Sequence, residues 1–421
     1  MNRRAIEQKV DNDVTSPSSP HVRRLVAGAA AGVVLSSCAS DAPQDTWKPA
    51  GDYAQEIHDL QWPIFMIAGI VGLIVFGVVL YAVIKFRDRG QPIPDQGHGN
   101  AFVEYVFIAI PALLLAGIAV PTVATVISLN DTDDADCVVN VTGQQWWWEF
   151  DYPVDADGDI CGFKPTGEAA PIVTSGQMVI PTDAKVVIRG TSRDVIHSFW
   201  VPKLNGKRDM VPGRVHTWNF HASQPGIYAG QCAEFCGLSH ANMRMEIVAL
   251  DAADFQAWID NQLEPYQSPA AGTLAAAGEA TFVSQCSRCH QVDGLTDADG
   301  DLVVSAPEQF VWSGAAPNLT NLMTRNTFAG GTWDLVTPDC RDDVWEATPS
   351  EFGAKYLAGV SDDCLNEIDL KDWLRNAPGK KPMYADPEKL DDTDGKTRGM
   401  PYLALSEDQI NELVAYLLER K

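Results

Sequence analysis

The sequence predicts a multi-domain membrane protein with a two-helix transmembrane hairpin, an all-β sandwich and a C-terminal all-α domain. Two apolar runs, at 62–86 and 104–129, are each long enough to cross a bilayer as a helix. From 138 to about 250, short β-branched and aromatic runs alternate with Gly, Pro and Asp turns, which is typical of a sandwich. Beyond 273, helical periodicity occurs at both ends of the remaining segment.

Length and charge restrict the class of protein further. A chain of 421 residues predicts two or three folded units. The formal net charge of −25 argues against nucleic acid and against an anionic membrane surface as partners, because carboxylates repel phosphates. Nine cysteines is an odd number, so one lacks an intramolecular partner unless some cysteines serve other chemistry.

The N-terminal segment 1–37 has the features of a signal peptide. Arg23 and Arg24 precede an apolar run at 25–35 that is too short to span a bilayer. The run ends in "LSSC", which resembles the lipobox of bacterial lipoproteins and would make Cys38 an acylated N-terminus. The alternative is ordinary cleavage nearby, with Cys38 as a spare thiol. In either case export permits disulfides outside the membrane.

The charges that flank the apolar runs predict their orientation in a bacterial plasma membrane. Lys85 lies at the end of the first run and Arg87 and Arg89 follow it, whereas the acidic segment 131–136 follows the second run. The positive-inside rule therefore places the loop 87–103 in the cytoplasm. The tether 38–61 and everything beyond 130 would lie on the extracytoplasmic side.

Glu104 is the one carboxylate at the start of the second run. A charge at that depth is costly unless it faces protein or water. It is therefore either an interfacial cap at the N-terminus of the helix or a proton-handling group.

The segments outside the membrane divide into two domains. The sandwich domain would cover 136–262 and close with a short amphipathic helix that begins near 252. A Pro/Ser/Ala/Gly-rich linker at 263–272 leads to the all-α domain at 273–421. Its last helix starts after Ser406 as N-cap, and its middle is polar and irregular.

The stretch "GQCAEFCGLSHANM", 230–243, concentrates metal-ligand residue types. A disulfide between Cys232 and Cys236 is the ordinary interpretation for an exported protein. However, two thiolates, an imidazole and a thioether form a soft ligand set, which suits copper, while structural zinc rarely uses Met. Cysteines four residues apart can bridge two copper ions if a second histidine is available.

That second histidine is His197, in "DVIHSFWVP" between two β-like segments. The expected pairing puts His197 with Met243 on one copper, and His240 with the carbonyl of Glu234 on the other. Two bridged ions share the charge change of one electron, and a rigid β scaffold limits ligand movement, as an electron relay requires.

These stretches, together with "DMVPGR" at 209–214 and "VTGQQWWWEFDY" at 141–152, resemble subunit II of cytochrome c oxidase over about 60–260. The resemblance implies a cupredoxin-like sandwich that holds the binuclear copper-A centre. Its ligands would be His197, Cys232, Glu234, Cys236, His240 and Met243.

The same resemblance assigns further roles. The Glu234 side chain would also reach a magnesium shared with subunit I, and Trp146 would be where electrons enter from a cytochrome c. Glu104 would lie at the mouth of a proton pathway. Gln144 and Trp147 stand where the family commonly has His and Tyr, which changes the docking surface and not the copper ligands.

The all-α domain carries "CSRCH" at 286–290, the attachment motif of haem c. Cys286 and Cys289 would bond the haem covalently, and His290 would bind the iron. A Met would raise the potential as sixth ligand. Met400 is favoured because Met-Pro shortly before the last helix is the family's pattern, and the alternatives are Met383 and Met323. "APNLTNLMTR" at 316–325 also resembles the haem-side loop of cytochrome c domains fused to this subunit.

The remaining cysteines suit two disulfides. An insertion from about 333 to 365 has little core of its own, and a bond between Cys340 and Cys364 would restrain it. Cys137 and Cys161 flank an early hairpin of the sandwich and could pair likewise. With copper, haem and the lipid-bearing Cys38, every cysteine then has a use.

The sequence therefore predicts the electron-input subunit of a proton-pumping terminal oxidase, with haem c, copper A and magnesium as cofactors. Its partners would be subunits I and III and a donor, either a cytochrome c or a cytochrome bc complex. Subunit II of a quinol oxidase lacks the copper ligands. A copper-maturation or storage protein would need neither haem nor Glu104, and an enzyme resembling nitrous-oxide reductase would not need two membrane spans.

Overall fold

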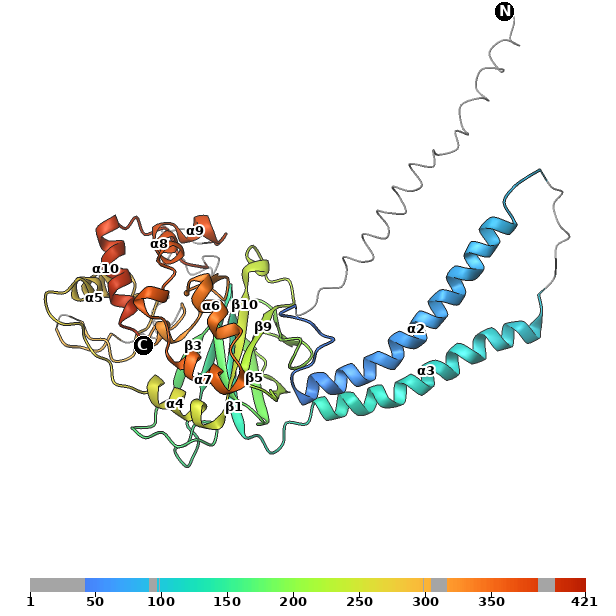
Figure 1. Cartoon of the computed structure of the whole chain (residues 1–421), viewed down its shortest axis with the longest axis horizontal. Coiled ribbons are helices and arrows are strands. Elements are labelled where there is room, and N and C mark those ends of the chain that lie inside the picture. Colours follow the sequence, from blue (N-terminus) through green and yellow to red (C-terminus); the bar gives the residue numbers. More distant parts are fainter. Residues whose placement is uncertain (1–41, 91–96, 98, 298, 304–315, 385–397) are drawn as a thin grey trace, which may run out of the picture. The chain divides into compact units, whose positions relative to one another are not determined.

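The computed structural model describes residues 42–90, 97, 99–297, 299–303, 316–384 and 398–421 (Figure 1). Cys38 and the predicted signal peptide therefore lie outside the described residues. The segment from Gln44 to Lys421 forms one compact unit. It contains the two long helices, the sandwich and the C-terminal region.

The two apolar runs form helices α2 (Asp52–Lys85) and α3 (Ala101–Leu129), which are long and apolar enough to cross a membrane. Helix α2 begins before the apolar run at 62, because the preceding polar residues are mostly good helix formers. Where α2 begins and α3 ends, Ser128 Oγ of α3 donates to the Glu56 carboxylate of α2 at 2.9 Å. Most side chains of both helices are exposed, as expected of surfaces that face lipid or other subunits.

Two five-stranded sheets form the sandwich, in the orders β3-β2-β1-β5-β8 and β4-β10-β9-β6-β7. The pairs β1/β5 and β10/β4 are parallel, and the other neighbours in these sheets are antiparallel. The strands are β1 (Cys137–Gln144), β2 (Trp147–Tyr152), β3 (Ile172–Ser175), β4 (Gln177–Pro181), β5 (Val186–Ser192), β6 (His197–Trp200), β7 (Arg208–Met210), β8 (His216–Phe220), β9 (Gly226–Cys232) and β10 (Arg244–Leu250).

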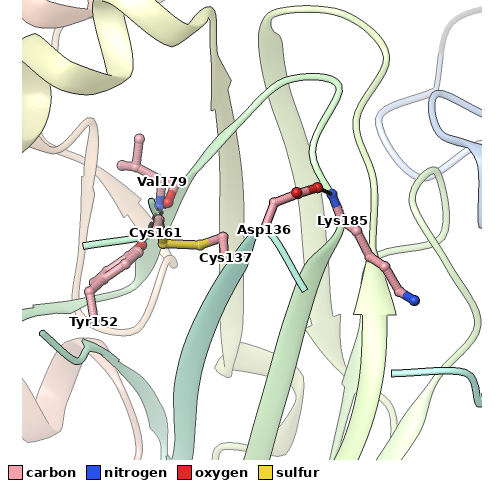
Figure 2. Close-up of a disulfide and its surroundings, with 6 residues drawn as sticks. All are labelled: Asp136, Cys137, Tyr152, Cys161, Val179 and Lys185. Atoms are coloured by element: carbon pink, nitrogen blue, oxygen red, sulfur yellow. Dashed lines mark hydrogen bonds between the residues drawn. A yellow bond between two sulfur atoms is a disulfide. The ribbon is translucent and has the colours of Figure 1, made fainter. Parts of the chain in front are cut away.

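Large aromatic side chains fill the space between the sheets. Trp148 and Phe199 are fully buried and meet edge to face at 5.0 Å between ring centroids. At one end of the core, the hydroxyl of Tyr152 donates to the Val179 carbonyl at 2.9 Å and accepts from its amide at 2.7 Å (Figure 2). The disulfide between Cys137 and Cys161 lies beside this tyrosine. The predicted two-helix hairpin and cupredoxin-like sandwich are confirmed.

The C-terminal region is built on α5 (Leu274–Gln285) and α10 (Glu407–Leu418), and α4 (Ala252–Gln262) precedes it. Ser406 caps α10 as predicted, in a capping box with Gln409. Helices α5 and α10 approach closely at Gly278, where a Cβ would lie 2.0 Å from the Glu412 carbonyl oxygen. Only glycine fits at that contact.

The prediction of an irregular middle was wrong. Residues between the two terminal helices form α6 (Pro338–Trp345), α7 (Pro349–Leu357), α8 (Glu367–Arg375), α9 (Ala377–Lys380) and the short strands β11 (Thr327–Phe328) and β12 (Trp333–Asp334). Helices of four to nine residues are too short to show a clear apolar period in the sequence. The expectation that the insertion has little core of its own holds, because its apolar residues are divided between two other cores. Phe352 and Tyr356 pack into the core of the sandwich, whereas Leu335, Val336 and Val360 pack into the core of the C-terminal region.

A second disulfide joins Cys340 in α6 to Cys364. In each of the two disulfides of the described residues, the bonded cysteines lie 24 positions apart in the sequence. One restrains the sandwich and the other restrains the insertion.

Candidate metal centre

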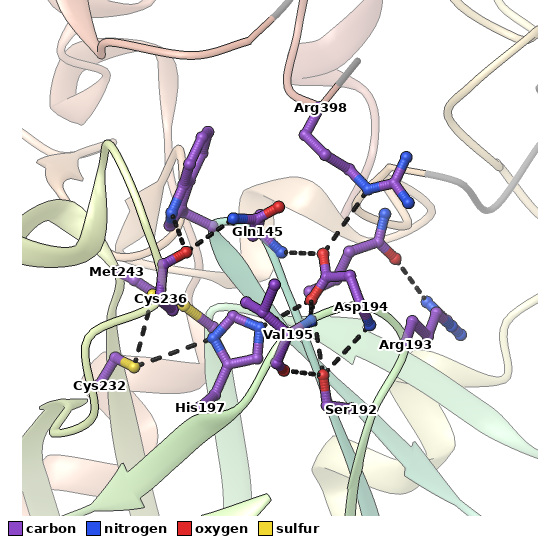
Figure 3. Close-up of polar contacts among 12 residues, drawn as sticks. Gln145, Ser192, Arg193, Asp194, Val195, His197, Cys232, Cys236, Met243 and Arg398 are labelled. Carbon is purple, nitrogen blue, oxygen red and sulfur yellow. Dashed lines mark hydrogen bonds and ion pairs between the residues drawn. The ribbon is translucent and has the colours of Figure 1, made fainter. Parts of the chain in front are cut away.

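The sequence stretch at 230–243 forms a tight loop between β9 and β10 (Figure 3). Cys232 is the last residue of β9, and its amide donates to the Met243 carbonyl at 2.9 Å, which closes the loop. Gly237 has φ +115, a conformation that side chains disfavour. A short 3₁₀ turn, His240–Asn242, then returns the chain to β10.

The loop and β6 bring the predicted ligand atoms together. The two thiol sulfurs, of Cys232 and Cys236, lie 3.7 Å apart, and both residues are buried together with His197. The neighbours of Cys232 Sγ are His197 Nδ1 at 3.9 Å and the Glu234 carbonyl oxygen at 3.3 Å. Those of Cys236 Sγ are His240 Nδ1 at 3.5 Å and Met243 Sδ at 3.8 Å.

These spacings fit two metal ions bridged by both sulfurs. Donors bound at about 2.0–2.3 Å to one ion with near-tetrahedral angles lie roughly 3.3–3.8 Å apart. Each predicted pair, His197 with Met243 and His240 with the Glu234 carbonyl, has one member beside each cysteine. Two ions on opposite sides of the sulfur pair could therefore each bind four ligands of the soft kind that copper prefers.

Without a metal, only one of the two thiols is acidic. The hydrogen bond from Cys236 and further donors lower the pKa of Cys232 to about 4, although burial opposes this. The same contact raises the pKa of Cys236, because a second buried negative charge would repel the first. A cation is therefore needed for both to be thiolates, which is the state that a bridging role requires.

Asp194 orients the first histidine, a role that the sequence analysis missed. Its Oδ1 lies 2.9 Å from His197 Nε2, which directs Nδ1 of the ring toward Cys232 (Figure 3). Burial alone would raise the pKa of Asp194, but the hydrogen bonds from His197 and from the Gln145 amide lower it. Such a carboxylate fixes the tautomer of a metal-binding histidine. The sequence did contain one indication of this role, since Asp194 lies three residues before the candidate ligand His197.

Gln145 and Trp146 connect the centre with its surroundings. The Trp146 indole nitrogen donates to the Cys236 carbonyl at 3.2 Å, and Gln145 Nε2 donates to the same oxygen at 2.7 Å. Trp146 is only 2% exposed. Its ring lies 5.4 Å from that of Tyr384, between centroids, and its carbonyl accepts from Lys381. The predicted surface for an external cytochrome c is thus covered by residues of the C-terminal region.

A cavity of about 410 Å³ adjoins Trp146 on the side of the C-terminal region. Its walls include Cys286, Cys289 and His290 from the end of α5. Nδ1 of His290 lies 2.7 Å from the Pro317 carbonyl oxygen, and burial lowers the pKa of the ring. The imidazole is therefore neutral with its proton on Nδ1, which leaves the lone pair that metal ligation needs on Nε2.

Two of the three candidate methionines line this cavity, Met383 and Met400. Met400 packs on the hydrophobic core of the C-terminal region, whereas Met383 packs on that of the sandwich and against Gly399. Met323 is fully buried in the core of the C-terminal region. Of the two methionines that line the cavity, Met400 is therefore the one that packs with the core that contains Cys286.

Arg325 is a second functional candidate that the sequence analysis did not single out. It is 3% exposed and lines the cavity, and its Nη1 donates to Ser175 Oγ at 2.9 Å. Within the described part of the chain, its Nε and Nη2 have no hydrogen-bond partner. A buried guanidinium with unused donors fits an anionic group, and a haem carries carboxylates. The residue ends the stretch "APNLTNLMTR", but nothing in that pattern indicates burial.

Glu104 lies in the first turn of α3, beside Gly99. The cap itself is Asn100, whose Oδ1 accepts from the amides of Phe102 at 3.1 Å and Val103 at 3.4 Å. Because Asn100 caps the helix, Glu104, which is exposed, is not needed as the cap.

Comparisons with known proteins agree with this geometry. Residues 137–250 match the family "Cytochrome C oxidase subunit II, periplasmic domain", and residues 44–125 match its "transmembrane domain". The cytochrome c oxidase subunit 2 of Alkalihalophilus pseudofirmus is 34% identical over 295 residues, which cover 68% of this chain and 81% of that protein. The chain belongs to the cytochrome c oxidase subunit II family.

Other relatives extend the comparison. The cytochrome c oxidase subunit 2 of Bacillus sp. (strain PS3) is 30% identical over 352 residues, 80% of this chain and 79% of that protein. The crystal structure of the periplasmic domain of subunit II of cytochrome oxidase from Bradyrhizobium japonicum is 27% identical and covers 31% of this chain and 96% of its own, with a TM-score of 0.27.

Family membership confirms the main functional prediction. As a member of the cytochrome c oxidase subunit II family, the chain is a membrane-anchored, electron-input subunit of a haem-copper oxidase that works with subunit I. Its sandwich is the copper-A domain of that family, and its buried His197, Cys232 and Cys236 lie close enough together to hold a metal ion.

Proposed function

We propose that this subunit carries two redox groups of its own, the binuclear copper centre in the sandwich and a covalent haem c in the C-terminal region. When bound, these groups would supply one-electron transfer from the haem to the copper pair. The observation that supports the proposal most strongly is that Cys286, Cys289 and His290 line the same cavity as Trp146.

The chain's residues have separate tasks in this scheme. Cys286 and Cys289 would attach the haem covalently, and His290 and Met400 would bind its iron. Arg325 is suited to bind a haem carboxylate. The alignment with the Bacillus relative covers 80% of this chain. Residues 1–272 make up a smaller share of the chain than that, so the alignment extends into the C-terminal region, which supports a C-terminal region shared by the two proteins.

The copper ligands keep the roles predicted from the sequence, with His197 and Met243 on one ion and His240 and the Glu234 carbonyl on the other. Trp146 links haem and copper, since its indole lines the cavity and donates to the carbonyl of Cys236. Electrons would pass from there to subunit I, where oxygen is reduced to water.

Further assignments rest on the sequence and the family resemblance. Glu104 would supply protons to a pumping pathway in subunit I, and the Glu234 side chain would share a magnesium with that subunit. The sandwich and the C-terminal region would be extracytoplasmic, Cys38 would be acylated, and subunit III would complete the complex. The donor would be a cytochrome c or a cytochrome bc complex.

The order of electron transfer can be tested in the purified oxidase by stopped-flow spectroscopy with a reduced donor cytochrome. The proposal predicts that haem c is reduced first. Copper A is reduced second, at the rate at which the haem transfers its electron. Copper reduction that precedes haem c reduction would contradict it, as would a chain without covalently bound haem.

A further inference from the structure

The middle of the insertion, residues 333–365, packs on the sandwich although the insertion belongs to the C-terminal region by sequence. Its two ends pack into the core of the C-terminal region, through Leu335 and Val360 among others. Phe352 and Tyr356 of α7 are 2% and 3% exposed and belong to the same buried cluster as the sandwich core. Val344, Ala347 and Leu357 pack on that cluster as well. Burial of two large aromatic side chains contributes several times the free energy of one surface contact.

Helix α7 also approaches α4 more closely than most residues allow. A Cβ on Gly353 would lie 1.8 Å from Asp254 Oδ2 and 3.0 Å from Asp254 Cβ. Gly353 is buried, whereas the next residue, Ala354, is exposed. The glycine is therefore required by the close approach of the two helices and not by its backbone conformation.

A buried polar cluster joins the same surfaces. Gln177 of β4 donates to the Glu246 carboxylate. Its own carbonyl accepts from the Asn326 amide at 3.0 Å and from the Tyr356 hydroxyl at 3.4 Å. Glu246 is buried together with Gln177. The cluster fixes the register of the insertion on β4 and β10, because each buried polar group depends on its partner.

A second group of contacts lies beside the haem cavity. Lys381 is 3% exposed, and its ammonium donates to the carbonyls of Trp146 at 2.8 Å and Ala329 at 2.7 Å. The Arg244 amide donates to the Gly330 carbonyl at 2.9 Å. These bonds tie the C-terminal region to the strands that carry Trp146 and the copper loop.

The linker at 263–272 is itself packed. The Arg420 guanidinium lies 4.5 Å from the centroid of the Tyr266 ring, and it donates to the Gln267 carbonyl at 3.1 Å. The Tyr266 hydroxyl lies 3.2 Å from that of Tyr416. A chain held in this way does not behave as a free tether.

We infer that the insertion is an intramolecular clamp that holds the C-terminal region on the sandwich in one arrangement, with the haem cavity kept against Trp146 throughout turnover. The disulfide between Cys340 and Cys364 closes the clamp. This inference rests on the proposed haem c and copper sites. It distinguishes a permanently docked electron donor from a tethered one that must find its docking position before each one-electron step.

The clamp predicts how electron transfer depends on salt. Transfer between docked groups does not change as the ionic strength rises from about 0.01 M to about 1 M, over which the Debye length falls from about 30 Å to about 3 Å. Transfer from a tethered domain changes over this range, because charges steer its docking. The rate is measured in the purified oxidase, by flash reduction of haem c and observation of copper A.

Gly353→Leu is the variant that should open the clamp, and Ala354→Leu is its matched control on the exposed face of the same helix. The clamp predicts at least about tenfold slower transfer and a new salt dependence in Gly353→Leu, and wild-type behaviour in Ala354→Leu. Equal, salt-independent rates in both variants would overturn the inference. If Gly353→Leu lacks the copper spectrum, Phe352→Ala provides the same comparison.

Hydrogen exchange gives a readout that needs no electron transfer. Replacing Cys340 and Cys364 by Ser should speed amide exchange in α7 at least about tenfold. The same replacement at Cys137 and Cys161, whose sequence separation is the same, should leave α7 unchanged. Wild-type protein without haem would contradict the proposed function, whereas unprotected α7 amides in the wild type would contradict the clamp.

Discussion

Asp194 Oδ1 and His197 Nε2 lie 2.9 Å apart, and this contact sets the direction in which the imidazole of His197, a predicted copper ligand, points. Asp194 in turn accepts from the Gln145 amide at 2.8 Å, beside Trp146. One carboxylate therefore connects a predicted metal ligand with the segment through which electrons would arrive. The proposed copper site would depend on Asp194, although Asp194 is not one of the predicted ligands.

Replacing Asp194 by Ala should weaken copper binding, because the His197 ring loses the acceptor that fixes its tautomer and orientation. Loss of such a partner typically lowers metal affinity about 10–100-fold. Competition with a copper chelator, followed by the charge-transfer absorption of the centre, measures the change. Asp209→Ala is the control, since Asp209 is exposed. Equal copper affinities in Asp194→Ala and Asp209→Ala would show that Asp194 does not support the copper site.

The methionine variants separate the candidates for the sixth haem ligand. Met400→Ala should abolish the low-spin spectrum of haem c and lower its potential, because a thioether ligand raises the potential. Met383→Ala should keep the low-spin spectrum, since Met383 packs on the sandwich core. Optical titration of both variants decides between them, and the reverse pattern would assign the ligand to Met383.

Glu246→Gln should alter the pH dependence of stability. Burial raises the pKa of Glu246 to about 7, from an ordinary value of 4.5. The folded protein therefore holds this proton more tightly, so the stability it contributes is complete below about pH 4.5 and is lost as pH rises through about 7. At about 1.4 kcal/mol per pKa unit, the loss is about 3 kcal/mol.

Denaturant unfolding of the detergent-solubilised chain, followed by tryptophan fluorescence between pH 4.5 and 8, measures this effect. The difference between wild type and Glu246→Gln should grow with pH, with the variant more stable at pH 8. Glu264→Gln, at an exposed position, should follow the wild type. A difference that stays constant with pH would show that Glu246 titrates normally.

Arg325→Gln should lower the midpoint potential of haem c. Removing a buried positive charge beside the cavity favours the ferric state, and a change of about 1 kcal/mol corresponds to ~40 mV for one electron. Arg325→Lys should recover part of the potential, because it restores the charge without the planar donor geometry. Redox titration at constant pH provides the values. An unchanged potential in Arg325→Gln would exclude contact with a haem carboxylate.

Spacing and residue type were sufficient to predict which side chains come together at the candidate metal centre. The soft donors at 230–243 needed one more imidazole, and His197 lies in β6 beside the loop. The long apolar runs and the alternating strands likewise predicted the helices and the sandwich, because both patterns are local.

Burial of charge could not be predicted in this way. Lys381 and Arg325 are each 3% exposed, yet nothing near them in the sequence separates them from surface cations. Their burial follows from the contact between the C-terminal region and the sandwich. The core on which the insertion packs could not be predicted for the same reason, since Phe352 and Tyr356 complete a core formed by residues elsewhere in the chain.

The central claim is that Cys232 and Cys236 bridge two copper ions. The most direct test is the copper content of the isolated full-length chain, measured together with its EPR and near-infrared spectra. The account predicts two coppers per chain and the multi-line signal of one unpaired electron shared by both ions. One copper per chain, or the signal of a single isolated Cu(II), would contradict it.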